Sequence, residues 1–166
     1  MLDSLITSKT RLRLLVKFFI NVANEGHLRG LATEFNESTN SIRKELNNLS
    51  EAGYLEKENV QNRVLYKANS RHPLFGLLQK VVRTYIGLDA ITAQVLERMG
   101  SVEKIILTGD YANGIDSGII EVTLIGKSLN KNYVENLSAK IEEVINRKVV
   151  FSLSETDVEG LEVFQA

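Results

Sequence analysis

The feature that most restricts the fold is the order of elements within residues 27–68. The amphipathic stretch HLRGLATEF is followed by three polar residues, NES, and then by a second amphipathic stretch that ends at Gly53. Helical spacing of the apolar residues, with Ser38 or Thr39 as N-cap, predicts two helices joined by a tight turn. YLEKENVQNRVLYKA follows at once and predicts a hairpin with a polar tip at 59–63.

A further helix is predicted upstream, from an N-cap at Ser8 to Asn24, where Glu25-Gly26 stops it. Helix, helix, turn, helix and hairpin is the order of a winged helix-turn-helix. We therefore expect residues 1–71 to form such a domain and to bind double-stranded DNA.

The helix predicted over 39–52 has two different faces. Ile42, Leu46 and Leu49 form an inward stripe, and the outward positions i, i+3, i+4 and i+7 hold two cations and two amides. Such side chains suit phosphate oxygens and base edges in a major groove, whereas the plainer alternative is a solvated face. The predicted contacts are Thr39, Asn40, Ser41, Arg43, Lys44 and Asn47 in the helix, and Gln61, Asn62, Arg63 and Lys67 in the wing.

Charge is unevenly distributed along the chain, although the net charge is only −1. Residues 1–71 hold 11 Lys and Arg against 8 Asp and Glu (net +3), and residues 72–166 hold 9 against 13 (net −4). Cysteine is absent and the two histidines lie far apart, so we expect no disulfide, no metal site and no cofactor. With no apolar run of membrane-spanning length, the expected location is the cytoplasm, with no membrane partner.

Residues 72–100 are predicted to be a helical connector. Its apolar residues cover more than one helix face, which indicates either enclosure within the chain or contact with a second chain. Because winged-helix proteins commonly pair on two-fold sites, we expect a homodimer through this connector and the first helix. The alternative is packing on the chain's own domains. Gly87 is expected to divide the connector into two helices.

Residues 101–166 are predicted to form a small α/β domain, which makes the whole chain α+β. Strands are expected at 102–109, 118–126 and 148–155, with a short fourth at LEVF. The helix expected at 131–147 turns an apolar set inward, namely Val134, Leu137, Ile141, Val144 and Ile145.

Residues 28–75 resemble the winged-helix domain of bacterial ArsR-like transcriptional regulators. The matching pattern is L-x-x-L-x-x-A-G-Y-L, which runs from Leu46 to Leu55. The YKAN…HPLF that follows is similar to a subgroup in which a helical connector and a nucleotidyltransferase-like domain come next. Metal-sensing members of the wider family use cysteine thiolates, so metal sensing is not implied for this chain.

The stretch TGDYANGIDSG resembles the first half of the signature of minimal nucleotidyltransferases, G-S-x-A-x-G-x(4–6)-S-D-x-D-L. The resemblance implies a glycine turn that holds phosphates and two strand carboxylates that hold Mg²⁺. Here Asp110 replaces the signature serine, and Gly118 and Ile120 occupy the two aspartate positions. Ser152 and Ser154 stand where a third carboxylate is expected. We therefore expect no nucleotidyl transfer and no enzyme activity.

Three roles remain for the C-terminal domain: a scaffold for the dimer, a sensor of a small effector such as a nucleotide or sugar nucleotide, or a docking site for a protein. Two alternatives remain for the whole chain: a nucleotidyltransferase targeted by its winged helix, or a protein-interaction module. The candidate ligand pocket comprises Gly109, Asp110, Tyr111, Asn113, Asp116 and Ser117.

Overall fold

A computed structural model describes all 166 residues, and the fold is α+β. The chain divides into two compact units, Met1–Val82 (unit 1) and Arg83–Ala166 (unit 2). The boundary falls inside the predicted connector 72–100, whose two helices are α4, Phe75–Ile86, and α5, Leu88–Arg98. None of the helices is long and apolar enough to cross a membrane.

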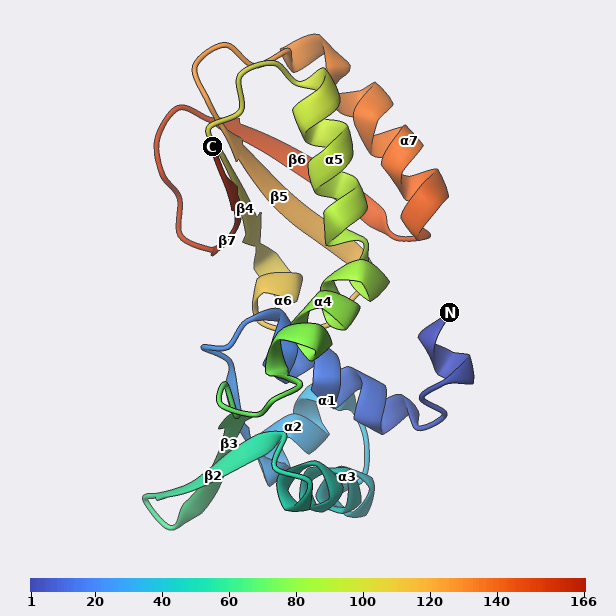
Figure 1. The fold of residues 1–166 in the computed structure, drawn as a ribbon, viewed down its shortest axis with the longest axis vertical. Helices are drawn as coiled ribbons and strands as arrows, with labels where there is room; N and C mark the ends of the chain where they lie inside the picture. The colour runs from blue at the N-terminus through green and yellow to red at the C-terminus, as the bar shows by residue number, and fades with distance from the viewer. The chain divides into compact units, whose positions relative to one another are not determined.

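Unit 1 begins with three α-helices and a short 3-10 turn (Figure 1). The predicted cap at Ser8 is confirmed, since its hydroxyl accepts from the Arg11 N–H. Of the two candidates for the cap of the third helix, Ser38 is the N-cap, and its hydroxyl accepts from the Ser41 N–H. The elements are η1 (Leu2–Ser4), α1 (Lys9–Ile20), α2 (Leu28–Phe35) and α3 (Thr39–Glu51).

A three-stranded antiparallel sheet completes unit 1, in the order β1-β3-β2. The predicted hairpin is β2, Leu55–Val60, and β3, Arg63–Ala68. Its loop is shorter than the predicted tip 59–63, because Val60 pairs with Arg63 and only two residues lie between them. These two residues, Gln61 and Asn62, both have positive φ. A two-residue hairpin turn needs this conformation to match the right-handed twist of its strands.

The first helix was predicted too long. It ends at Ile20 rather than Asn24, and Glu25–His27 instead forms β1, which pairs with β3. This pairing joins residues about 40 positions apart, so local periodicity gave no sign of it. The inward stripe of α3 was correct, since Ile42, Leu46 and Leu49 are buried.

Unit 2 is a four-stranded mixed sheet in the order β6-β5-β4-β7. The strand β4 is antiparallel to β5 and β7, while β5 and β6 are parallel and are joined through α7. The elements after α5 are β4 (Lys104–Thr108), α6 (Gly109–Ala112), β5 (Ile119–Ile125), η2 (Lys131–Tyr133), α7 (Val134–Ile145), β6 (Lys148–Ser154) and β7 (Leu161–Gln165).

The helices α5 and α7 lie side by side over one face of this sheet (Figure 1). That face carries the alternating residues Ile120, Val122 and Leu124 of β5, all buried. In α7 the expected inward set holds for Leu137 and Ile141, but Val144 is 74% exposed. All four predicted strands form, and the turn after β4 closes as the short helix α6.

Candidate nucleic-acid interface

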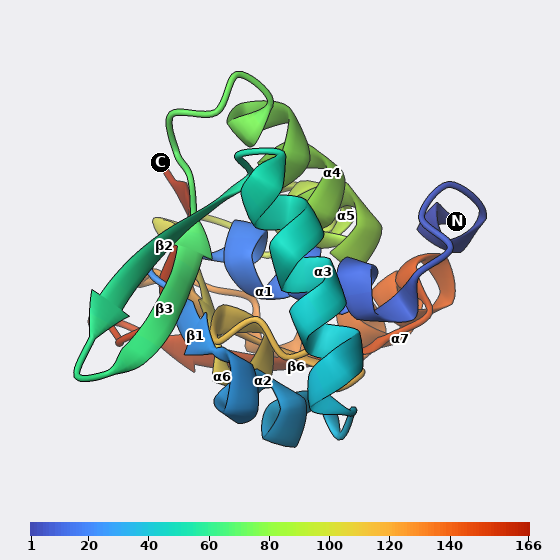
Figure 2. The ribbon, with the colours of Figure 1, turned by 90° about the horizontal axis from the view of Figure 1, so that it is seen from below.

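The outward face of α3 keeps its cations accessible and without acidic partners. Asn40, Arg43, Lys44 and Asn47 are all exposed, as are Thr39 and Ser41 in the first turn. Arg43 donates to the Asn40 side chain at 3.0 Å, and neither Arg43 nor Lys44 forms an ion pair. The predicted contact residues of the helix are therefore all on its exposed side. The helix α3 lies in front in Figure 2.

The acidic residues next to this helix pair with α1 instead. Glu45, on the inner side of α3, accepts from Arg11 at 2.8 Å and from Ser8 at 2.9 Å. Although burial raises the pKa of Glu45, its hydrogen bonds to Arg11 and Ser8 outweigh burial and lower it. Three carboxylates in all connect α1 to the α2–α3 region: Glu45, Glu34 through Lys17 at 2.8 Å, and Glu37 through Arg13 at 3.1 Å.

The hairpin projects beside α3 on the same side of unit 1 (Figure 2). Gln61, Asn62 and Arg63 at its end are exposed, and Lys67 is half-exposed with Glu56 4.0 Å away. Burial raises the pKa of the Tyr66 hydroxyl, and the nearby Arg43 opposes that shift. Tyr66 on the hairpin and Arg43 on α3 are thus close enough to interact electrostatically.

In unit 2, the glycine turn after β4 is filled by the protein's own side chain. Gly109 has a φ of +66°, and a Cβ there would lie 1.7 Å from the Glu121 carboxylate. Glycine is therefore needed both for the backbone conformation and for the close approach of Glu121.

Tyr111, Asp116 and Arg147 form a partly buried network near that turn. The Tyr111 hydroxyl donates to Asp116 and accepts from the Gly118 N–H at 3.0 Å and from Arg147 at 3.1 Å. Arg147 also pairs with Asp116 at 3.2 Å, donates to the Tyr85 carbonyl and covers the Tyr85 ring. Burial, together with the bond to Asp116, raises the pKa of Tyr111 to about 12.

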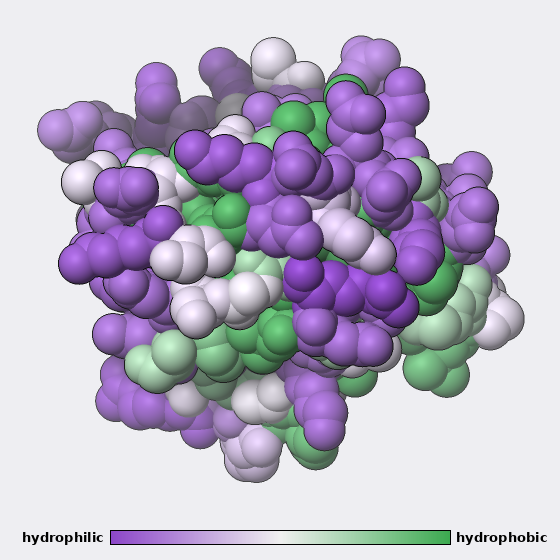
Figure 3. Space-filling model, turned by 90° about the horizontal axis from the view of Figure 1, so that it is seen from above, coloured by the Kyte–Doolittle hydropathy of each residue, from purple (hydrophilic) through white to green (hydrophobic).

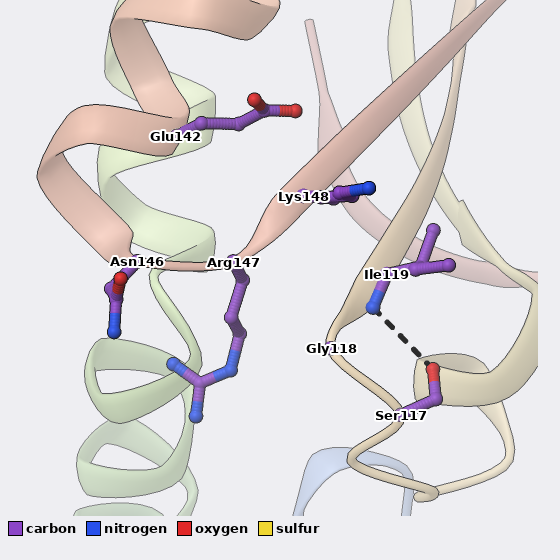
Figure 4. A pocket seen from close by; sticks show the side chains of 7 residues that line it. All are labelled: Ser117, Gly118, Ile119, Glu142, Asn146, Arg147 and Lys148. Atoms are coloured by element: carbon purple, nitrogen blue, oxygen red, sulfur yellow. Dashed lines mark hydrogen bonds between the residues drawn. The ribbon is translucent and has the colours of Figure 1, made fainter.

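A shallow pocket of about 460 Å³ lies beside this network (Figure 4). Of the six residues predicted to form a ligand pocket, only Ser117 lines it. Tyr111 is fully buried, and Asp116 is engaged by Arg147. Gly109, Asp110 and Asn113 are exposed on the turn. The lining residues are Ser117, Gly118, Ile119, Glu142, Asn146, Arg147 and Lys148.

Sequence reasoning missed Arg147 and His27. Arg147 follows Asn146, which ends α7 in the left-handed conformation, and a cation at a helix end gives no signal of a partner 31 residues earlier. His27 caps α2 and approaches Arg63 on the neighbouring strand β3. No group of three or more Asp, Glu or His side chains is placed to hold a metal ion.

Comparisons with known proteins add little to this geometry. The sequence matches no protein-family model and no curated protein. The crystal structure of Sso10a-2, a DNA-binding protein from Sulfolobus solfataricus, is similar over 52% of this chain and 87% of its own, with a TM-score of 0.36 and 14% identity. Such a TM-score is below the level that indicates a shared fold, so the function must be argued from the residues themselves.

Proposed function

We propose that this chain is a DNA-binding transcriptional regulator, and that unit 1 is a winged helix-turn-helix of the ArsR-like kind. In this proposal α3 enters the major groove and the β2–β3 hairpin is the wing, in contact with the DNA backbone. Arg43, Lys44 and Asn47 are the main contacts to bases or phosphates, and Arg63 contacts a phosphate.

The observation that carries the proposal is the separation of paired from unpaired charge within unit 1. The acidic residues Glu34, Glu37 and Glu45 are neutralised by α1. Arg43, Lys44 and Arg63 have no carboxylate partner and are exposed. Unpaired cations beside an exposed helix face attract a polyanion, and their binding to phosphates releases counterions.

The double substitution Arg43→Ala with Lys44→Ala tests this assignment. Since both side chains are exposed and make no ion pair, the fold should remain intact. We expect the affinity for DNA that was recovered from the protein's own cell by crosslinking to fall at least about 30-fold. The slope of log affinity against log salt concentration should decrease by the equivalent of roughly two phosphate contacts. Fluorescence anisotropy with labelled duplexes over a salt series measures both.

The matched control is Lys9→Ala with Lys80→Ala, which removes the same charge from exposed positions of unit 1 outside α3. This variant should bind nearly as the parent does. If the two double variants bind DNA equally well, α3 is not the recognition helix. If the parent binds no duplex even at low salt, the protein-interaction alternative is favoured.

We also propose that unit 2 is a non-catalytic relative of nucleotidyltransferases that serves as a scaffold or senses a small ligand. The support is chemical: the Glu121 carboxylate fills the glycine turn, and Asp116 is neutralised by Arg147. Neither carboxylate belongs to a group of three or more acidic or histidine side chains that could hold the metal ions that nucleotidyl transfer uses. Transfer of label from nucleoside triphosphates with Mg²⁺, abolished by Glu121→Ala, would favour the enzymatic alternative instead.

A homodimer is the third part of the proposal. Three exposed apolar side chains support it: Leu77 and Val81 on one face of α4, 61% and 39% exposed, and Leu74 just before the helix, 41% exposed. A cytoplasmic dimer with two recognition helices would read the two halves of a palindromic site.

A further inference from the structure

His27 occupies a junction between the hairpin and α2. It is the last residue of β1 and the N-cap of α2, where its Nδ1 accepts from the Gly30 N–H at 3.1 Å. It lies opposite Leu65 on β3, so Arg63, two residues along, is on the same face of the sheet. The Arg63 Nη1 is 3.3 Å from the His27 Nε2.

These two contacts cannot both be hydrogen bonds. A neutral imidazole has one acceptor nitrogen, and the other carries a proton. When Nδ1 accepts from Gly30, Nε2 carries the proton and faces a guanidinium N–H, so two donors meet without an acceptor. When Nε2 accepts from Arg63 instead, α2 loses its cap.

His72 shows the satisfied version of the same arrangement. Its Nδ1 accepts from the Leu74 N–H at 3.0 Å, and its Nε2 lies 3.2 Å from the Ala52 carbonyl oxygen. One tautomer makes both bonds, because the second partner is an acceptor. The second partner of His27 is instead a donor, the Arg63 guanidinium, so the His27 Nε2–H has no acceptor such as an oxygen atom.

We propose that His27 and Arg63 together bind one phosphate of the DNA backbone. A phosphate oxygen accepts from the His27 Nε2–H and from the Arg63 guanidinium, while Nδ1 continues to cap α2. This inference rests on the proposed DNA-binding function and adds a contact residue outside α3 and the hairpin.

No carboxylate of the chain pairs with Arg63. On the same sheet face, Glu56 faces Lys67 and Arg71 at 4.0 and 3.7 Å, and Glu58, opposite Leu65, is exposed and forms no ion pair. Arg63 is the exposed first residue of β3, at the end of the hairpin. The hairpin projects beside α3 (Figure 2).

The substitution His27→Asn separates the two roles of this side chain. Asparagine is a favoured N-cap and retains an acceptor for Gly30, but it is too short to place a donor beside Arg63. We expect DNA affinity to fall about ten-fold, to the same extent for specific and unrelated duplexes, as for a lost hydrogen bond to a charged group. The thermal unfolding midpoint should stay close to the parent's.

His72→Asn is the matched control and should bind DNA as the parent does. A double-mutant cycle with Arg63→Ala tests the shared phosphate: in the Arg63→Ala background, His27→Asn should weaken binding by no more than about two-fold. Arg63 is exposed, so Arg63→Ala folds whether or not His27→Asn does, and it should lower affinity for all duplexes equally.

The outcomes separate this inference from the proposed function. If the parent binds DNA and His27→Asn binds equally well, or if the two substitutions are additive, His27 does not share a phosphate with Arg63, and the role of α3 is unaffected. If Arg63→Ala binds as the parent does, the site is likewise excluded. If the parent binds no DNA, the proposed function itself fails.

Discussion

Glu45 and Glu121 illustrate at the scale of single residues how an acidic group can serve structure alone. Glu45 is held by Arg11 and Ser8 against α1, and Glu121 fills the space above Gly109. Glu45 is thus fixed by hydrogen bonds to α1, and Glu121 by its close approach to the Gly109 backbone.

The pairing of Glu45 predicts a particular dependence of stability on pH. Its pKa is lower in the folded chain than its ordinary value of 4.5, so the carboxylate stabilises the fold above that value. This contribution is lost as the pH falls through the lowered pKa. At neutral pH, Glu45→Gln should reduce the free energy of unfolding by about 2 kcal/mol.

The difference between Glu45→Gln and the parent should shrink in urea titrations as the pH falls below 4.5 and through the lowered pKa of Glu45, since protonation removes the charge from the parent as well. Glu58→Gln, at an exposed position without an ion pair, is the control and should change stability little at any pH. A constant difference between Glu45→Gln and the parent from pH 7 to pH 3 would contradict the assignment.

At the scale of elements, a glycine allows the chain to change direction between α4 and α5. Gly87 separates α4 from α5 with a φ of +99°, a conformation unfavourable for other residues. A Cβ at Gly87 would also lie 2.4 Å from the Ile145 side chain of α7. The break between the two helices therefore allows both the turn and the close packing against α7.

Gly87→Ala should accordingly destabilise unit 2 by about 2 kcal/mol or more, from backbone strain and from the clash with Ile145. The free energy of unfolding in urea, followed by circular dichroism, measures the effect. Gly76→Ala is the matched control: it lies in α4 with nothing within 4 Å of the added Cβ, so alanine there should be neutral or stabilising. Equal stability of the two variants would contradict the predicted strain.

At the scale of the whole molecule, the chain combines a basic N-terminal part with an acidic C-terminal part. DNA attracts the first and repels the second, so the charge difference favours one end of the chain as the nucleic-acid contact. The exposed apolar face of α4 lies between the parts in sequence and is the proposed dimer surface.

Leu77→Glu tests this surface. We expect the parent to sediment as a dimer and Leu77→Glu as a monomer, because two carboxylates would be buried in a symmetric contact. The monomer should also bind a palindromic site more weakly, since it engages one half-site. Val144→Glu, at another exposed apolar position, is the control and should remain dimeric. A parent that is monomeric at all concentrations would exclude the proposed dimer.

The sequence by itself determined the elements whose signals are local. The sequence predicted the Ser8 cap of α1, a cap of α3 at Ser38 or Thr39, the inward stripe Ile42-Leu46-Leu49, the hairpin and the break at Gly87. Their physical causes act within a few residues: capping hydrogen bonds, helical periodicity and positive φ. These local signals are sufficient to predict a helix at α3 followed directly by the β2–β3 hairpin.

The tertiary structure decided the partners of the charged and polar groups. Arg11 meets Glu45 across 34 residues, His27 approaches Arg63 across 36, and Arg147 reaches Asp116 across 31. No local pattern encodes such pairs, because they form only when the helices pack and the strands find their register. Packing thus decided which cations are neutralised and which remain unpaired on the outer face of α3 and the hairpin.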